Sequence, residues 1–360
     1  MNIWHELPQP FLILAPMEGV TDVIFRQVIA HAGRPDLFFT EFTNVSSYAS
    51  DKGRANALER LTVAESDAPI IAQIWGKEPA HFAKTCAALA SLGFSGVDLN
   101  FGCPDKNVNR AGGGAAMIKT PELAIECFNN ARNSTTLPVS IKTRLGWSNV
   151  EEFRDWLPTL LREHPAALTV HLRTRKEMSK VPAHYELIPE ILNLRANESP
   201  STKLIINGDI KDRAHALALH QEFPEVDGFM IGRGVFSNPY CFTDHHPTKE
   251  ELLDLLQMHL DLYDGRETRL SRSIRDNGSE RRSEPRNDGR ERGGDEKAWP
   301  HAPSYREVQP HAPSYESLKH FFKIYINNFP GASDFRAKLM ETHSVPEARA
   351  VIADFTAKLS

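Results

Sequence analysis

The chain has 360 residues, 41% of them hydrophobic, and carries a formal net charge of −5 at pH 7. This length and apolar content suffice for a large buried core, enough for one barrel-sized domain and a smaller one. The negative charge argues only weakly against a polyanionic partner, because net charge does not reveal local basic patches.

The cysteines and the apolar segments exclude several classes of protein. The four cysteines are widely spaced, without a CxxC pair or a Cys/His pairing at ligand spacing, so neither a zinc site nor a disulfide framework is expected. No segment approaches the ~20 apolar residues of a membrane span, and the N-terminus lacks the basic region of a signal peptide. We therefore expect a cytoplasmic protein without a metal or a membrane association.

Short apolar segments alternate with segments of helical pattern as far as Asn238. Continuous apolar runs are typical of parallel strands that are buried on both faces. Eight such strands are predicted, over 11–15, 37–39, 69–74, 97–99, 138–142, 167–171, 203–207 and 228–232. Eight βα units predict a (β/α)8 TIM barrel. A doubly wound open sheet is the alternative, and the absence of GxGxxG after the first strand disfavours it.

The pattern becomes purely helical from Thr248, with helices predicted over 250–263, 315–327, 334–343 and 345–359. Residues 265–314 between the first two helices are rich in Arg, Glu, Asp, Ser and Gly, so we predict a disordered insert there. The chain is therefore divided into a catalytic barrel, 1–245, and a small helical domain, 246–360, that contains the insert.

Polar residues and glycines follow the predicted strands at their carboxyl ends, where a barrel carries its active site. Each one alone has an ordinary explanation, since a strand-end lysine is usually solvated and a strand-end histidine is usually a satisfied polar group. Together they indicate a site. The candidates are Pro16, Met17, Glu18, Glu41, Gln73, Asn100, Cys103, Lys142, Arg144, His171, Arg173, Asn207, Gly208, Asp209, Gly232 and Arg233.

The loops after the seventh and eighth strands contain 207–209 and 232–234, where barrels commonly bind a phosphate through backbone N–H groups. Ordinary tight turns are the alternative. A phosphate there, with Lys142 and Gln73 at neighbouring strand ends, suits flavin mononucleotide (FMN), because a cation near the ring edge stabilises the reduced flavin. Cys103, on a turn between Gly102 and Pro104, could then act as a proton donor. A small buried hydrophobe is the other interpretation of a lone cysteine.

Six ordered motifs carry a resemblance to a known family. They are APMEGVTD (15–22), LNFGCPDKNVNRAGGGAAMIK (99–119), IKTRLGW (141–147), VHLRTR (170–175), INGDI (206–210) and IGRG (231–234). In this order they resemble the tRNA-dihydrouridine synthases. The resemblance implies an FMN-containing barrel, followed by a helical tRNA-binding domain. It also implies reduction of the C5–C6 bond of particular uridines in the tRNA D-loop, with NADPH reducing the flavin.

The same resemblance assigns roles to matching positions. Cys103 would protonate C5 of the uracil after hydride reaches C6, and Asn100 would lie against the flipped base. FMN would be held by Pro16, Met17, Glu18, Gln73, Lys142, His171, Asn207, Gly208, Asp209, Gly232 and Arg233. The tRNA phosphates would meet Arg144, Arg173, Arg175, Lys176 and Lys180. The glycine run at 112–114 and the segment 39–42 look most like the bacterial branch that modifies position 16, and we expect a monomer.

Leu172 departs from the family pattern, which has a small residue between the histidine and the arginine. A larger side chain there is expected to crowd the cofactor or to shift the loop beside His171. Two other functions remain open: an FMN barrel that reduces a small pyrimidine or enone, and a tRNA-binding protein without catalysis. The first would not need the helical domain, and the second would need neither Cys103 nor Lys142.

Overall fold

The structure is a computed structural model that describes residues 2–280, 314–327 and 329–357, with the backbone alone for 266–280. Among these residues, no helix combines the length and the apolar character needed to cross a membrane.

The strands form one parallel β-barrel, as the apolar runs predict. Their order around the sheet is β1-β9-β8-β7-β6-β5-β4-β2, and β3 continues the line of β2 along β4. The barrel closes between β1 and β2, where the backbone N–H of Leu14 donates to the carbonyl oxygen of Leu37 at 3.3 Å. The strands are β1 (Phe11–Leu14), β2 (Phe38–Phe39), β3 (Thr43–Asn44), β4 (Ile70–Trp75), β5 (Gly96–Phe101), β6 (Val139–Arg144), β7 (Ala167–His171), β8 (Lys203–Asn207) and β9 (Gly228–Ile231).

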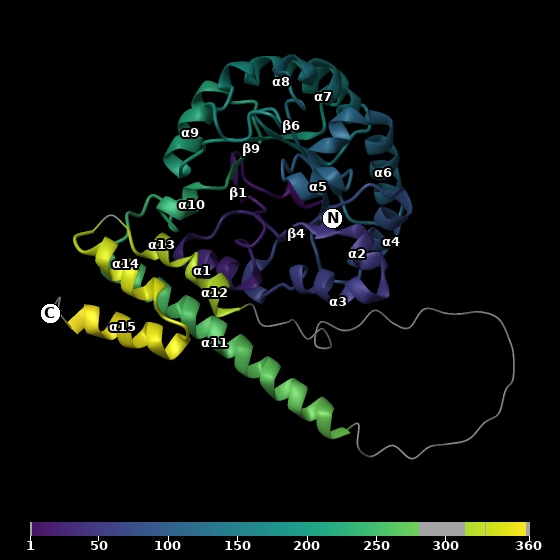
Figure 1. Cartoon of the computed structure of the whole chain (residues 1–360). Coiled ribbons are helices and arrows are strands. Elements are labelled where there is room, and N and C mark those ends of the chain that lie inside the picture. The colour runs from purple at the N-terminus through teal and green to yellow at the C-terminus, as the bar shows by residue number, and fades with distance from the viewer. Residues whose placement is uncertain (1, 281–313, 328, 358–360) are drawn as a thin grey trace, which may run out of the picture.

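Helices surround the barrel (Figure 1). Several begin at residues that the sequence marks as helix starts: the side chain of Asp22 accepts from the backbone N–H of Phe25 at 2.8 Å, and prolines open α4 and α6. These outer helices are α1 (Val23–Gly33), α2 (Val45–Ala49), α3 (Asp51–Arg60), α4 (Pro79–Leu89), α5 (Lys106–Arg110), α6 (Pro121–Asn133), α7 (Phe153–Leu161), α8 (Ile188–Glu198), α9 (Arg213–Glu222) and α10 (Gly234–Ser237).

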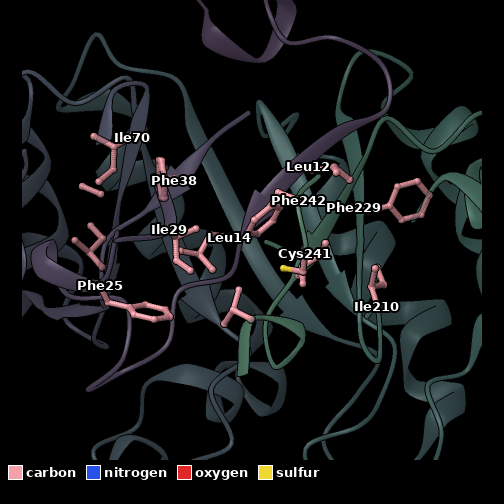
Figure 2. Packing of buried hydrophobic residues seen from close by; sticks show 14 of the residues in the cluster. Leu12, Leu14, Phe25, Ile29, Phe38, Ile70, Ile210, Phe229, Cys241 and Phe242 are labelled. Carbon is pink, nitrogen blue, oxygen red and sulfur yellow. The ribbon is translucent and has the colours of Figure 1, made fainter. Parts of the chain in front are cut away.

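Alternate strand residues build two apolar cores. Phe11 and Ile13 of β1 face the barrel interior, whose amino-terminal end is covered by the buried ring of Trp4, 6.0 Å from that of Phe11. Leu12 and Leu14 face outward and pack with the helices, and Figure 2 shows Leu14 in this outer cluster together with residues of α1. Toward the carboxyl ends of the strands, polar side chains replace apolar ones inside the barrel. This end of the interior, the upper interior, therefore contains the polar groups that a reaction needs.

In the described part of the chain, five helices follow the barrel: α11 (Lys249–Glu280), α12 (Tyr315–Lys319), α13 (Phe322–Tyr325), α14 (Ala332–Met340) and α15 (Val345–Ala357). They lie on one side of the barrel, beside α1 and α10 (Figure 1). The imidazole of His259 is buried in this junction, with its Nδ1 2.7 Å from the hydroxyl of Tyr325 and its ring 4.6 Å from that of Phe321. Burial lowers the pKa of His259 to about 3, so this contact is made by a neutral ring.

The first of these helices is longer than predicted. The sequence interpretation ends it at Tyr263 and begins a disordered insert at Gly265, whereas α11 continues to Glu280. One glycine in a helix costs only about 1 kcal/mol, and the first proline after it is Pro285, so nothing local stops the helix earlier. The rest of the predicted insert, 281–313, lies outside the described residues, and the domain boundary at 245 stays a prediction.

A substitution at Gly228 of β9 tests how tightly the barrel interior is packed. It pairs with Phe11, and a Cβ at this position would lie 2.2 Å from Cε2 of the buried Phe11 ring. We expect Gly228→Ala to lower the free energy of unfolding by about 1–3 kcal/mol, because the ring cannot move away within a packed interior. Urea denaturation measures this loss. As a control, Gly265→Ala in α11, where a Cβ meets nothing within 4 Å, should stabilise the protein by about 0.5–1 kcal/mol. Equal effects of the two substitutions would contradict this packing.

Candidate active site

A cavity of about 680 Å³ opens at the carboxyl ends of the strands. Most of the residues that the sequence predicts for the site line this one cavity, although they come from seven different strands or strand ends. They are Pro16, Met17, Gln73, Asn100, Cys103, Lys142, Arg144, His171, Asn207, Gly208, Asp209, Gly232 and Arg233.

Cys103 lies on a tight turn directly after β5. The side-chain oxygen of Asn100 accepts from the backbone N–H of Gly102 at 3.1 Å and from that of Cys103 at 2.9 Å, which holds the turn closed. Cys103 is partly exposed, whereas Cys86, Cys127 and Cys241 are buried. Burial raises the pKa of the Cys103 thiol, against the opposing effect of nearby cations. The thiol therefore stays protonated near neutral pH and is available as an acid.

A buried polar layer lies beneath this turn. The Asp98 carboxylate accepts from Nε2 of Gln73 at 2.7 Å and from the hydroxyl of Ser140 at 2.7 Å, and Gln73 in turn accepts from Nδ2 of Asn100 at 3.0 Å. Burial raises the pKa of Asp98 to about 6, while these hydrogen bonds oppose the shift. Asp98 is thus ionised at neutral pH and brings one negative charge under the cavity.

Lys142 ends β6 inside the cavity. Its Nζ donates to Oδ1 of Asn207 at 3.0 Å, and the amide of Asn207 donates to the carbonyl oxygen of Met230 at 2.7 Å. Burial, and then the neighbouring charge of Arg144, lower the pKa of Lys142 to about 8, while Asp98 opposes the shift. Lys142 is therefore a cation at neutral pH whose charge is sensitive to its surroundings.

Arg144 joins two loops at the rim. Its Nε donates to the carbonyl oxygen of Gly102 at 2.8 Å, and its Nη1 donates to those of Thr174 and Met178, both at 3.1 Å. These bonds fix the turn of Cys103 to the loop that follows β7. Burial lowers the pKa of Arg144 to about 10, which still leaves it protonated at neutral pH.

His171 lines the cavity with a neutral ring. Burial, and then Arg144, lower its pKa well below the usual value. Its Nδ1 is buried and has no hydrogen-bond partner among the described residues. Because this nitrogen has almost no accessible surface, it does not face the cavity.

Asp209, in the loop after β8, is the centre of a group of hydrogen bonds in another part of the cavity wall. Its carboxylate accepts from Arg173, from Arg233 at 2.7 Å and from the backbone N–H of Ala183 at 3.1 Å. Gly208 precedes it with a φ of +125°, a backbone conformation that L side chains rarely adopt. Arg233 remains more than half exposed, so it can still meet an anion in the cavity.

Six predicted site residues do not line this cavity: Glu18, Glu41, Arg173, Arg175, Lys176 and Lys180. Glu18 pairs with Arg60 of α3 at 2.7 Å and lines a neighbouring cavity, and its role as a cofactor residue stays a prediction. The carboxylate of Glu41 accepts from the backbone N–H of Gly19 at 2.7 Å. Arg173 is buried against Asp209 and cannot reach a phosphate on the surface. Arg175 lies on the face of Trp147, with its guanidinium carbon 4.7 Å from the ring centre, and Lys176 is exposed on the rim.

Leu172 belongs to the buried core and does not line the cavity, which places its side chain away from a molecule bound there. The sequence interpretation does not single out Asp98, although a carboxylate within a buried strand is itself a signal. Phe42, from the segment 39–42, and Lys211 also line the cavity, and neither is predicted as a site residue. No grouping of His, Cys, Asp or Glu suited to a metal ion occurs in the described part of the chain.

Comparisons with known proteins agree on one family. The family model described as dihydrouridine synthase matches residues 13–259. The chain is 46% identical to the probable tRNA-dihydrouridine synthase 2 of Bacillus subtilis (strain 168), and 43% identical to the probable tRNA-dihydrouridine synthase of Staphylococcus aureus (strain COL). Each match covers 99% of this chain and 97% of the relative. Among solved structures, an old yellow enzyme homologue from Zymomonas mobilis aligns with a TM-score of 0.44 and 15% identity, over 63% of this chain and 86% of that one. So distant a likeness adds nothing about the chemistry.

The ion pair between Asp209 and Arg173 predicts a specific loss of stability. We expect Asp209→Ala to lower the free energy of unfolding by about 2–3 kcal/mol, because it leaves a buried guanidinium without its carboxylate. Asp244→Ala is the matched control, since Asp244 accepts from Arg213 on the surface, and it should cost less than about 1 kcal/mol. Urea unfolding at pH 7, on protein freed of bound small molecules, compares the two. Similar losses would contradict a structural role for Asp209.

Proposed function

This chain belongs to the dihydrouridine synthase family, and from that premise we propose that it reduces uridine to 5,6-dihydrouridine in the D-loop of tRNA, using FMN and NADPH. The observation that carries the proposal is the set of residues that line the cavity together with Cys103. It is the accessible cysteine of the four in the chain, and it lines the same cavity as Lys142, His171 and the glycine-containing ends of β8 and β9.

The residues of the cavity fit FMN. Arg233 is paired with Asp209, yet more than half of its side chain stays exposed, so its guanidinium can also meet a phosphate in the cavity. At Gly232, an added Cβ would lie 3.5 Å from Ala15, so a glycine keeps the cavity wall there open to a ligand. We infer that FMN is held by these residues, with Lys142 and Gln73 at the polar edge of its ring and Pro16 and Met17 against its face.

When bound, FMN would supply the hydride that C6 of the uracil receives, with NADPH as the reductant. The protein supplies the matching proton: Cys103 donates it from its thiol to C5, and the resulting thiolate is stabilised by Lys142 and Arg144 until it takes a proton from water. Both cations are close enough to Cys103 to lower its pKa against the effect of burial. The sum is uridine, NADPH and one proton going to dihydrouridine and NADP⁺.

The substrate base has to leave the tRNA stack to reach this cavity. We propose that Asn100 and Arg144 lie against the flipped base, since both line the cavity beside Cys103. Arg175 and Lys176 lie on the rim and are placed to meet the phosphates, with Trp147 as a support for Arg175. The helices after the barrel would hold the body of the tRNA. Position 16 is the predicted target within the D-loop.

An activity assay tests the proposed reaction. Purified protein with FMN, NADPH and unmodified tRNA transcript should produce dihydrouridine, and Cys103→Ala should lower the rate by about 100-fold or more, because the proton donor is lost. The variant should still bind flavin and oxidise NADPH. Mass spectrometry of nuclease digests measures dihydrouridine, and sequencing of the modified positions identifies the uridine.

Cys86→Ala, on the outer face of the barrel in α4, is the control and should keep the parental rate. NADPH oxidation without dihydrouridine would indicate a flavin reductase of another substrate. Protein that takes up no flavin and shows no turnover would favour an RNA-binding protein without catalysis.

The rate of the reaction is expected to depend on pH through Lys142. Lys142 is protonated below its pKa of about 8 and loses its charge above it, so we expect the rate of dihydrouridine formation to fall as the pH rises through this value. The Cys103 thiol, with a raised pKa, remains protonated there. Lys142→Arg should move the decline to higher pH, because a guanidinium keeps its charge. A decline at the same pH in this variant would assign it to another group.

A further inference from the structure

A line of buried side chains connects the floor of the cavity to the turn of Cys103. It runs from the carboxylate of Asp98 through the amides of Gln73 and Asn100 to the backbone N–H groups of Gly102 and Cys103. The distances along it are 2.7, 3.0, 3.1 and 2.9 Å. Asp98 and Gln73 are fully buried, and Asn100 is 5% exposed. Water therefore cannot easily replace a lost partner in this line.

The groups at the two ends of this line allow only one orientation of the two amides between them. An ionised carboxylate only accepts hydrogen bonds, and a backbone N–H only donates them. Gln73 must therefore turn its NH₂ group to Asp98 and its oxygen to Asn100, and Asn100 must turn its NH₂ group to Gln73 and its oxygen to the turn. Flipping either amide would bring two donors or two acceptors together. The backbone N–H groups of the turn and the carboxylate of Asp98 therefore require the same orientation of both amides, and Asp98 is the acceptor on which the line ends.

The same arrangement determines which hydrogen-bonding groups the cavity presents to a ligand. Gln73 and Asn100 both line the cavity, and an NH₂ group has two hydrogens, of which the line uses one. Asp98 is also anchored from a second side by the hydroxyl of Ser140. Its orientation is therefore fixed independently of the two amides.

We propose that Asp98 is a positioning residue of this enzyme: as the terminal acceptor of the line, it anchors the Gln73 and Asn100 amides and through them holds the Cys103 turn in place. Only the catalytic part of this inference, that Cys103 is the proton donor, rests on the proposed function. The hydrogen-bond polarity itself does not depend on it.

Asp98→Leu tests the anchor, because it keeps about the same size and gives Nε2 of Gln73 no acceptor. We expect dihydrouridine formation by the holoenzyme to fall about 10- to 100-fold. Activity alone is ambiguous, since Asp98 also supports the charge of Lys142. The second readout is therefore the rate at which iodoacetamide alkylates Cys103, which should rise as the turn loosens. Cys103→Ala gives the background of the three buried cysteines.

Asp98→Asn is the conservative variant that keeps the acceptor. Its Oδ1 can accept from Gln73 while its NH₂ group donates to the hydroxyl of Ser140, which lies 3.4 Å from the carbonyl oxygen of Val97 and can donate there. We expect the alkylation rate of Cys103 in this variant to stay close to the parental value. Ser140→Ala is the matched control, because it removes one hydrogen bond from the same carboxylate and leaves the acceptor of Gln73 in place. It should change the alkylation rate less than Asp98→Leu does.

An alkylation rate in Asp98→Leu equal to that of the parent, or equal rates in Asp98→Leu and Asp98→Asn, would overturn the proposal. If Asp98→Leu fails to fold, Gln73→Met cuts the line while Asp98 keeps Ser140, and it must also accelerate alkylation. Failure of the proposed function would look different, because the parent protein would then form no dihydrouridine while the alkylation rates still depended on the acceptor at position 98.

Discussion

The barrel closes where the N–H of Leu14 meets the carbonyl of Leu37, and this closure decides which side chains meet inside it. In a closed parallel barrel, alternate residues of every strand face one interior, and all carboxyl ends reach the same rim. Apolar residues such as Phe11 and Ile13 fill the lower interior. Polar residues of β4 to β8 fill the upper interior, so the cavity and its chemistry are consequences of the closure.

The upper interior contains more positive than negative charge. Burial lowers the pKa of both Lys142 and Arg144, and the charge of Arg144 lowers that of Lys142 further. His171 is held neutral beside them. Asp98, below the cavity, is the acid whose charge supports Lys142. Such a site favours an anion and, in the proposed reaction, a thiolate that forms when Cys103 gives up its proton. The low polarity that makes these charges effective also makes each unpaired group costly.

The helices after the barrel are attached by packing that excludes water. The neutral ring of His259 contacts Tyr325 and Phe321, and on the barrel side the ring of Phe25 in α1 lies 5.1 Å from that of Phe321. Aromatic contacts of this kind fix the helices against α1. The rim with Arg175 and the helical region are therefore parts of one framework, on which a large substrate can be held in a single orientation.

The sequence by itself determined the barrel, its eight strand positions and most of the residues that line the cavity. The reason is that continuous apolar runs mark strands that are buried on both faces, and the strand ends of a barrel share one rim. The tertiary structure alone decided which partner each charged side chain meets. Glu18 pairs with Arg60 and Arg173 with Asp209 because α3 and the loop after β8 lie beside them. It also showed Asp98 beneath Gln73 and Asn100, a contact across neighbouring strands that depends on register, which no local pattern in the chain encodes.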